Sequence, residues 1–180
     1  MNILTNSSIQ LRAPEPSDID LLYIWENDTD IWQLSNTLTP FSKQTMKDFV
    51  ESINIDIYQS KQQRFMIDSI DKSGKKLTIG TIDLFDFDPF NNRAGIGILI
   101  DKKSRNKGYA SNALKILIDY SFNILQLHQL YCNINIDNKT SISLFENHGF
   151  LLSGKKKEWG KTLSGWKDEL FFQLINTNKK

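Results

Sequence analysis

The distribution of apolar and polar residues along the chain predicts a series of β-strands separated by short turns. Some apolar segments alternate with polar residues and others are continuously apolar, and both patterns are typical of strands. Turn-forming residues separate them at residues 73–75 and 88–92, and a further turn is expected to contain Gly160 and Gly165. The expected strands are residues 9–12, 64–70, 77–85, 94–100, 128–136, 151–157 and 168–175.

Apolar residues at helical spacing predict helices before and after the central strands. A capping-box pattern between Ser17 and Asp20 predicts the start of a first helix, and Ser42 is the expected N-cap of a second. The polar segment 27–40 between them is expected to form a loop. The second half of the chain is expected to hold a long helix and a short helix that ends at Gly149.

The order of strand, long helix and strand over residues 94–136 predicts a right-handed parallel crossover, whereas the preceding strands predict an antiparallel meander. The expected fold class is therefore α/β (α+β), with a mixed sheet that contains both antiparallel and parallel strands. At 180 residues, with 39% hydrophobic and 24% charged residues, the chain is expected to form one domain over residues 1–180. Residues 176–180 are expected to be frayed.

The single cysteine, Cys132, excludes an internal disulfide and is typical of a reducing compartment. Because Cys132 lies in an alternating apolar strand, it is interpreted as a small buried side chain rather than a nucleophile.

No signal-peptide pattern and no apolar run near the roughly 20 residues of a membrane helix are found, so a cytoplasmic protein is expected. His128 and His148 are not spaced as a metal-binding pair, and no metal is expected.

Charge is distributed unevenly along the chain, although the net charge is only +1. Residues 1–60 hold three basic and nine acidic side chains, whereas residues 61–180 hold nineteen basic and twelve acidic ones. This asymmetry favours one cationic and one anionic ligand, although ordinary solvated surface explains it as well. The basic residues are not interleaved with aromatic residues, so a nucleic acid is not an expected partner. A membrane is not expected either, because the sequence has no apolar run of membrane-spanning length.

A short basic turn at residues 105–110 carries most of the functional information. The turn follows an apolar strand and opens directly into a helix. Backbone N–H groups and the positive end of a helix therefore meet at one point, which suits a phosphate group. The turn lacks the Gly-Lys-Ser/Thr ending of a P-loop and the three glycines of a dinucleotide-binding turn. Taken alone, Gly108 is explained as well by a simple turn.

A second segment, one helix and one strand later, makes the first more specific. Residues 138–150 follow the pattern Asn-x-x-Ser-x-x-Leu-x-Glu-x-x-Gly-Phe, and the two segments at this separation resemble the GNAT superfamily of N-acetyltransferases. The resemblance covers nearly the whole chain and is strongest to the branch of spermidine acetyltransferases and ribosomal-protein alanine acetyltransferases. The further residues that match this branch are Leu11, Arg12, Asp18, Trp25, Gly165, Trp166 and Asp168.

The resemblance implies a GNAT-like fold with a binding site for acetyl-CoA as cosubstrate. The strands of the parallel crossover would be splayed, the pantetheine arm would lie beside residues 98–100, and residues 105–110 would wrap the pyrophosphate. Considered singly, Asn138 is explained as well by helix capping. The cofactor-binding residues implied by the resemblance are Ile98, Leu99, Ile100, Arg105, Asn106, Lys107, Gly108, Tyr109, Ala110, Ser111, Asn138, Ser141 and Phe145.

Candidate catalytic and acceptor-binding residues follow in part from the same resemblance. A free backbone N–H at Leu99 or Ile100 would polarise the thioester carbonyl. An amine must lose a proton before it attacks, so the site needs a base. The resemblance implies Asp83, which lies on the strand beside the cofactor strand at a position that is acidic in spermidine acetyltransferase-like sequences; an ion pair of Asp83 with a surface lysine is the alternative. The candidate acceptor-binding residues are Glu26, Asp28, Trp32 and Asp83, with solvated surface or core packing as the simpler explanation for the first three.

Phe145 departs from the family pattern. Many GNAT members have a tyrosine here that protonates the departing CoA thiolate, and phenylalanine has no such proton; Ser141, Tyr109 or water are the candidate replacements. The sequence therefore predicts an acetyl-CoA-dependent N-acetyltransferase that acts by direct attack in a ternary complex, with a catalytically degenerate CoA-binding module as the alternative. The expected acceptor is a polyamine, with a protein N-terminus, an aminoglycoside or another small amine as alternatives. A homodimer or larger homo-oligomer is compatible with the family.

Overall fold

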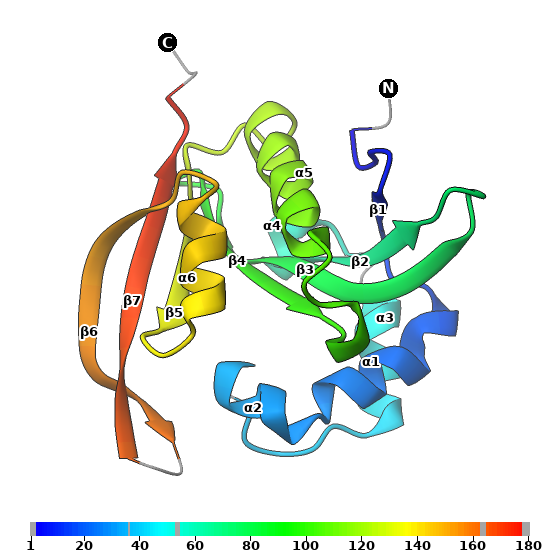
Figure 1. Ribbon diagram of the computed structural model, residues 1–180, viewed down its shortest axis with the longest axis horizontal. Helices are drawn as coiled ribbons and strands as arrows, with labels where there is room; N and C mark the ends of the chain where they lie inside the picture. Colours follow the sequence, from blue (N-terminus) through cyan, green and yellow to red (C-terminus); the bar gives the residue numbers. More distant parts are fainter. Residues whose placement is uncertain (1–2, 36, 53–54, 163–164, 178–180) are drawn as a thin grey trace.

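The computed structural model of the protein describes residues 3–35, 37–52, 55–162 and 165–177. The strands are β1 (Ile9–Arg12), β2 (Gln63–Ile70), β3 (Lys76–Asp88), β4 (Arg93–Ile100), β5 (Gln129–Asn135), β6 (Leu151–Thr162) and β7 (Gly165–Ile175). They form a seven-stranded sheet in the order β1-β2-β3-β4-β5-β7-β6 (Figure 1). Neighbouring strands are antiparallel except β4 and β5, which are parallel. The predicted meander and parallel crossover are therefore confirmed.

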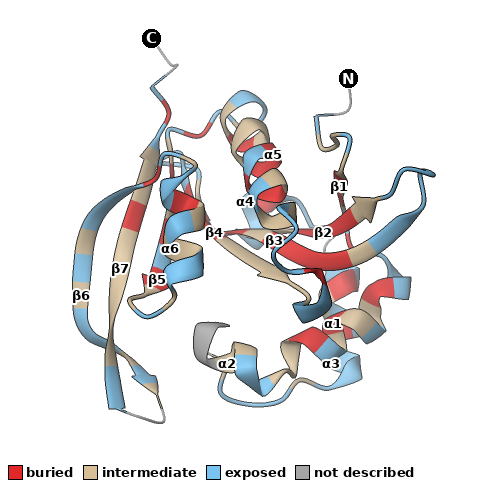
Figure 2. Ribbon diagram, viewed as in Figure 1, coloured by how far each residue is buried: buried red, intermediate tan, exposed pale blue. Residues whose placement is uncertain are grey.

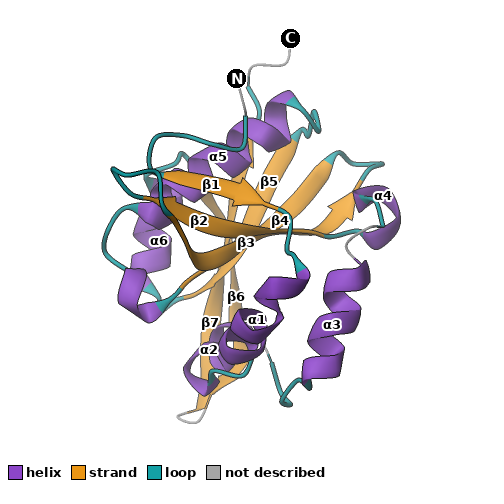
Figure 3. Cartoon of the chain, turned by 90° about the vertical axis from the view of Figure 1, so that its right-hand side faces the viewer, coloured by secondary structure: helices purple, strands orange, loops and turns teal. Residues whose placement is uncertain are grey.

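Helices cover both faces of this sheet. The helices are α1 (Ile19–Glu26), α2 (Thr29–Ser35), α3 (Lys43–Ser52), α4 (Ile57–Ser60), α5 (Tyr109–Asn123) and α6 (Lys139–Glu146), with 3₁₀ turns η1 (Pro16–Asp18) and η2 (Lys102–Ser104). Helices α5 and α6 lie on one face, and α1 and α3 lie on the other (Figures 1 and 3). Across the described ranges, none of the helices combines the length and the apolar character needed to cross a membrane.

Two apolar clusters hold the helices to the sheet. Figure 2 shows in red the buried segments of the helices and strands. In the larger cluster, Leu114 of α5 packs with Ile82 of β3 and Leu130 of β5, and all three side chains are fully buried. In the smaller cluster, Trp25 of α1 packs with Met66 of β2. Burial of several such side chains, at about 1.5–3 kcal/mol each, supplies most of the favourable free energy of folding.

Segment 27–40 is not a loop throughout, as its polar sequence predicted, because α2 lies within it. Asp28 begins this helix: its side chain accepts a hydrogen bond from the Asp30 N–H at 3.0 Å, and its carbonyl accepts one from the Ile31 N–H at 2.8 Å. An aspartate that satisfies the first N–H groups stabilises a short helix even where the composition is typical of a loop.

The capping box predicted for α1 lies two residues too late in the sequence, although α1 itself begins at Ile19. The capping interaction joins Glu15 and Asp18, with the Glu15 N–H donating to Asp18 Oδ2 at 2.8 Å, rather than Ser17 and Asp20. Ser42 is confirmed as the N-cap of α3, because its hydroxyl accepts a hydrogen bond from the Thr45 N–H at 3.0 Å.

The last two strands are longer than their sequence predicted. Gly160 lies inside β6 and Gly165 begins β7, so no single turn contains both residues. The pairing shifts register near Glu158, which has a positive φ of 49° and donates its N–H to Asp168 Oδ1 at 2.8 Å. A bulge of this kind interrupts the alternation of apolar and polar side chains while the hydrogen bonds between β6 and β7 continue. The strand predicted at residues 151–157 therefore ended too early.

The expected fraying of residues 176–180 is wrong at Asn176. This residue is 7% exposed, and its N–H donates to the His128 carbonyl at 2.8 Å. Residues 178–180 lie outside the described part of the chain.

Candidate active site

Strands β4 and β5 separate in the middle of the sheet. Their described pairing runs from Arg93 opposite Gln129 to Gly95 opposite Tyr131. Beyond that point β4 stays paired with β3 on its other side, and β5 stays paired with β7. The splayed strands expected from the sequence are therefore present.

Backbone groups of β4 face this gap in an alternating pattern. The Asp101 N–H donates to the Ile79 carbonyl at 2.8 Å, and antiparallel pairs alternate between hydrogen-bonded and non-hydrogen-bonded. Leu99, opposite Thr81, therefore directs its peptide groups toward β3, and those of Ile98 and Ile100 point toward the gap. The Ile100 carbonyl accepts a hydrogen bond from Arg105 Nε at 2.9 Å.

The turn between β4 and α5 has the geometry of an anion site. Gly108 has a φ of 78° and is the residue immediately before the first turn of α5, whose leading N–H groups have no partner within the helix. A Cβ at Gly108 would have no heavy atom within 4 Å, so this side of the turn is open. Arg105 and Lys107 are exposed beside it. The turn therefore combines N–H donors, a helix N-terminus and positive side chains, which fit a pyrophosphate.

The second segment has clear structural roles. The Asn138 side chain caps α6 by accepting the Ser141 N–H at 3.1 Å, as the simpler explanation held. Phe145 is 3% exposed and packs edge-to-face on Phe150, with ring centroids 5.0 Å apart. The hydroxyl of Ser111, on the first turn of α5, lies 3.2 Å from His148 Nε2. This contact links the end of α6 to the start of α5, and the sequence did not predict it.

Asp83 of β3 faces Arg64, an arginine that no sequence motif marks as functional. Arg64 of β2 lies directly opposite Asp83, and Arg64 Nε is 2.6 Å from Asp83 Oδ1. On its other side, Arg64 Nη1 lies 2.6 Å from Glu26 Oε1. Burial raises the pKa of Asp83, and the positive charge of Arg64 opposes this shift. The signal available in the sequence was a cation at the first position of the strand predicted at residues 64–70.

Asp83 also lies beside the gap. Its Cα partner on β4 is Gly97, and a Cβ at Gly97 would lie 3.7 Å from Asp83 Oδ2. The carboxylate therefore lies over Gly97 of β4, the residue before Ile98. The backbone groups of Ile98 face the gap. Asp83 therefore borders the gap between β4 and β5.

The other candidate acceptor residues lie around α2. Lys102 Nζ is 2.9 Å from Asp28 Oδ2 and 2.8 Å from Asp30 Oδ2, and its hydrogen bond lowers the pKa of Asp28. Trp32 Nε1 donates to the Glu26 carbonyl at 2.8 Å. Both predicted carboxylates, Glu26 and Asp28, are thus paired with cations of the chain itself.

Cys132 is 1% exposed, and burial raises the pKa of its thiol to about 12. A thiol with this pKa is almost entirely protonated at neutral pH, so Cys132 is poorly suited to act as a nucleophile.

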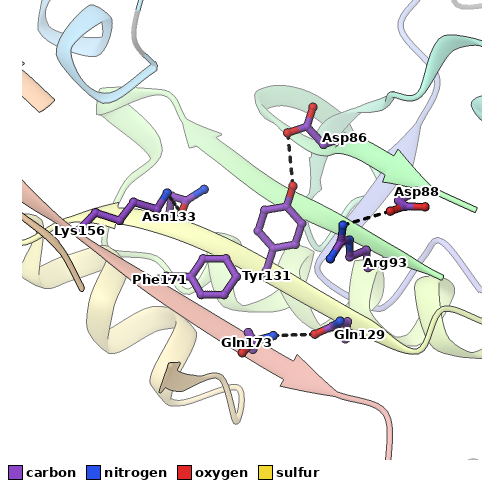
Figure 4. A pocket seen from close by; sticks show the side chains of 9 residues that line it. All are labelled: Asp86, Asp88, Arg93, Gln129, Tyr131, Asn133, Lys156, Phe171 and Gln173. Atoms are coloured by element: carbon purple, nitrogen blue, oxygen red, sulfur yellow. Dashed lines mark hydrogen bonds and ion pairs between the residues drawn. The ribbon is translucent and has the colours of Figure 1, made fainter. Parts of the chain in front are cut away.

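A polar hollow of about 510 Å³ lies elsewhere on the sheet, where β4 and β5 are still paired (Figure 4). Arg93 lies 3.2 Å from Asp88 within it, and the Tyr131 hydroxyl donates to Asp86 at 3.3 Å. The Asp86, Asp88 and Arg93 side chains therefore already have partners within the hollow.

Comparison with known proteins gives a consistent result. The model of the acetyltransferase (GNAT) domain family matches residues 8–151. A spermidine N(1)-acetyltransferase of Vibrio cholerae is 27% identical over 149 residues, covering 83% of this chain and 82% of that protein. An uncharacterized N-acetyltransferase, p20, of Bacillus licheniformis is 30% identical, covering 97% of each. A crystal structure of spermidine N-acetyltransferase from Vibrio cholerae in complex with CoA and spermine superposes with a TM-score of 0.84 at 24% identity, covering 94% of this chain and 96% of that one.

Proposed function

Because the chain belongs to the GNAT family of acetyltransferases, we propose that it transfers an acetyl group from acetyl-CoA to a primary amine of a polyamine. The transfer is direct, in a ternary complex and without an acyl-enzyme. The observation that carries the proposal is the position of Asp83, which overhangs β4 beside the point where β4 leaves β5.

The donor side uses the turn and the gap. Acetyl-CoA supplies the thioester, and residues 105–110 with Ser111 hold its pyrophosphate at the start of α5. The Ile98 and Ile100 peptide groups pair with the pantetheine arm, because they face the gap. One of their N–H groups, rather than that of Leu99, polarises the thioester carbonyl.

The acceptor side uses Asp83 as proton acceptor. An amine of pKa about 10.4 is neutral in only about one molecule in 10³ at pH 7, so the site must remove a proton before attack. Burial raises the pKa of Asp83, which makes it a better base than an exposed aspartate, while Arg64 orients its carboxylate.

A polyamine is favoured by the acidic residues near α2 and by the relatives. Glu26, Asp28 and Asp30 lie close together in the sequence, at the end of α1 and the start of α2. Each is paired with a cation of the chain. Two kinds of relative differ in acceptor: the Vibrio cholerae protein is a spermidine acetyltransferase, and an Escherichia coli relative that is 27% identical is a ribosomal-protein-serine acetyltransferase.

Thiol release from acetyl-CoA, measured with spermidine, short peptides and aminoglycosides as acceptors, tests the proposal. We expect spermidine to give the highest kcat/KM. A higher kcat/KM for a peptide or an aminoglycoside would contradict the polyamine as acceptor and would support that compound instead. Tight CoA binding without release for any acceptor, with turnover only in Phe145→Tyr, would instead support the degenerate module.

Gly108→Val is expected to raise the KM for acetyl-CoA by about tenfold or more, equivalent to ~1.4 kcal/mol. A valine side chain would extend into the open side of the turn and hold the pyrophosphate away from the N–H groups. Gly74→Val is the matched control, because Gly74 has a φ of 83° and equally open surroundings but lies in the β2–β3 turn. An equal KM in the two variants would contradict this role for Gly108.

Assembly is a further part of the proposal. One solved relative is a dodecameric spermidine N-acetyltransferase from Vibrio cholerae, with a TM-score of 0.76. We propose a homo-oligomer for this chain too, and light scattering would contradict it by giving the monomer mass of 20.8 kDa.

A further inference from the structure

Arg64 is held by three groups at once. Its guanidinium lies 2.6 Å from Glu26 Oε1, 2.6 Å from Asp83 Oδ1, and 4.9 Å from the centroid of the Phe49 ring. The Arg64, Glu26 and Asp83 side chains are 15%, 23% and 15% exposed. These contacts fix a positive charge at the site where the acceptor amine is proposed to bind.

The cluster of Glu26, Arg64 and Asp83 carries a net charge of −1. Two carboxylates share one guanidinium, and Lys102 is paired with Asp28 and Asp30 instead of with this cluster. One carboxylate charge is therefore left to balance an incoming ammonium. Partial burial strengthens this balance, because charges interact more strongly where water is scarce.

We propose that Arg64 is a specificity-determining residue of the acceptor site, which limits the site to one positive charge of the acceptor at a time. This inference rests on the proposed amine acetylation. Without the guanidinium, Glu26 and Asp83 would present two negative charges within reach of one another and would favour an acceptor with two neighbouring ammonium groups. With Arg64 in place, the second ammonium of a polyamine gains little from the cluster.

The test compares spermine with n-butylamine, which carries a single ammonium group. The measured quantity is the ratio of their kcat/KM values. Arg64→Met removes the cation and keeps most of the side-chain length, so the ratio is expected to rise about tenfold, equivalent to ~1.4 kcal/mol. Glu26→Gln removes one carboxylate and leaves the cluster neutral, so the ratio is expected to fall by a similar factor.

The double variant Arg64→Met/Glu26→Gln separates charge balance from structure. It returns the cluster to a net charge of −1 through Asp83 alone, and we expect it to restore the ratio of the unchanged protein. A purely structural role for Arg64 predicts no such restoration, since the double variant loses both ion pairs. If Arg64→Met fails to fold, two other variants carry the test. Glu26→Gln is expected to lower the ratio, and Arg64→Lys, which keeps the positive charge, is expected to leave the ratio unchanged.

Lys115→Met is the matched control. It removes one positive charge from an exposed pair with Asp119 on α5, and the ratio should not change. Unchanged ratios in both single variants of the cluster, with spermine and n-butylamine acetylated, would overturn the inference and leave the proposed function standing. Absence of acetylation of any amine by the unchanged protein would overturn both.

Discussion

Asp18→Ala is expected to lower the free energy of unfolding by about 3 kcal/mol, because it leaves Arg12 without its main partner. Asp18 is 3% exposed and receives two hydrogen bonds from the Arg12 guanidinium, at 2.6 and 2.9 Å. It also accepts the Glu15 N–H at 2.8 Å, so the same carboxylate fixes the start of α1 to β1. Urea denaturation followed by circular dichroism measures the loss.

The pH dependence of stability provides a second measurement of the same carboxylate. Burial would raise the pKa of Asp18, but the hydrogen bonds from Arg12 and the Glu15 N–H outweigh it and lower the pKa below its ordinary value of 3.8. A carboxyl group with a lowered pKa contributes stability above its ordinary pKa and loses it as the pH falls through the lowered value. We therefore expect the Tm of the unchanged protein to fall below about pH 4, and the Tm of Asp18→Ala to fall less.

The control for Asp18 is Asp119→Ala, which removes an exposed carboxylate paired with Lys115. Exposed pairs of this kind contribute only about 0–1 kcal/mol. Equal losses of stability in the two variants would contradict a special role for the Arg12 and Asp18 pair.

Gly80→Ala is expected to destabilise the protein by about 3 kcal/mol and to weaken acetyl-CoA binding as well. A Cβ at Gly80 would lie 2.1 Å from the Leu99 carbonyl oxygen and 3.1 Å from the Ile100 Cα. Both atoms belong to the β4 backbone, so the strand itself must shift. Because the peptide groups of Ile100 border the gap, this shift would also change the donor site.

Gly160→Ala tests whether the effect comes from the close approach at Gly80. A Cβ at Gly160 would lie 4.0 Å from the Lys167 carbonyl oxygen, which is ordinary van der Waals contact. Thermal unfolding and acetyl-CoA titration should show little change in this variant. If Gly80→Ala behaves in the same way, the close approach of β3 to β4 does not constrain the site.

Local patterns were sufficient for most of the fold. The strand predicted at residues 94–100 matches β4, because its continuous apolar sequence contains the information for a buried strand. The turn at residues 105–110 was also readable, since Gly108 adopts the positive φ that glycine tolerates best. The α2 helix was missed because one N-cap, Asp28, outweighs the loop-like composition around it.

The direction in which the peptide groups of β4 point could not be predicted from local sequence patterns. Leu99 and Ile100 are neighbours in an apolar strand, and nothing local distinguishes them. The register between β3 and β4 turns the Leu99 peptide groups toward Thr81 and leaves those of Ile98 and Ile100 facing the gap. This distinction exists only once two strands are paired.

By itself, the sequence determined the order of the strands, the basic turn and the resemblance to the family, because each is carried by short local patterns along the chain. Only the tertiary structure decided the charge balance of the acceptor site. Arg64 meets Asp83, 19 positions away, through the pairing of β2 and β3, and meets Glu26, 38 positions away, through the packing of α1 on the sheet. Coulomb interaction depends on distance in space, and no local pattern in the sequence encodes that distance.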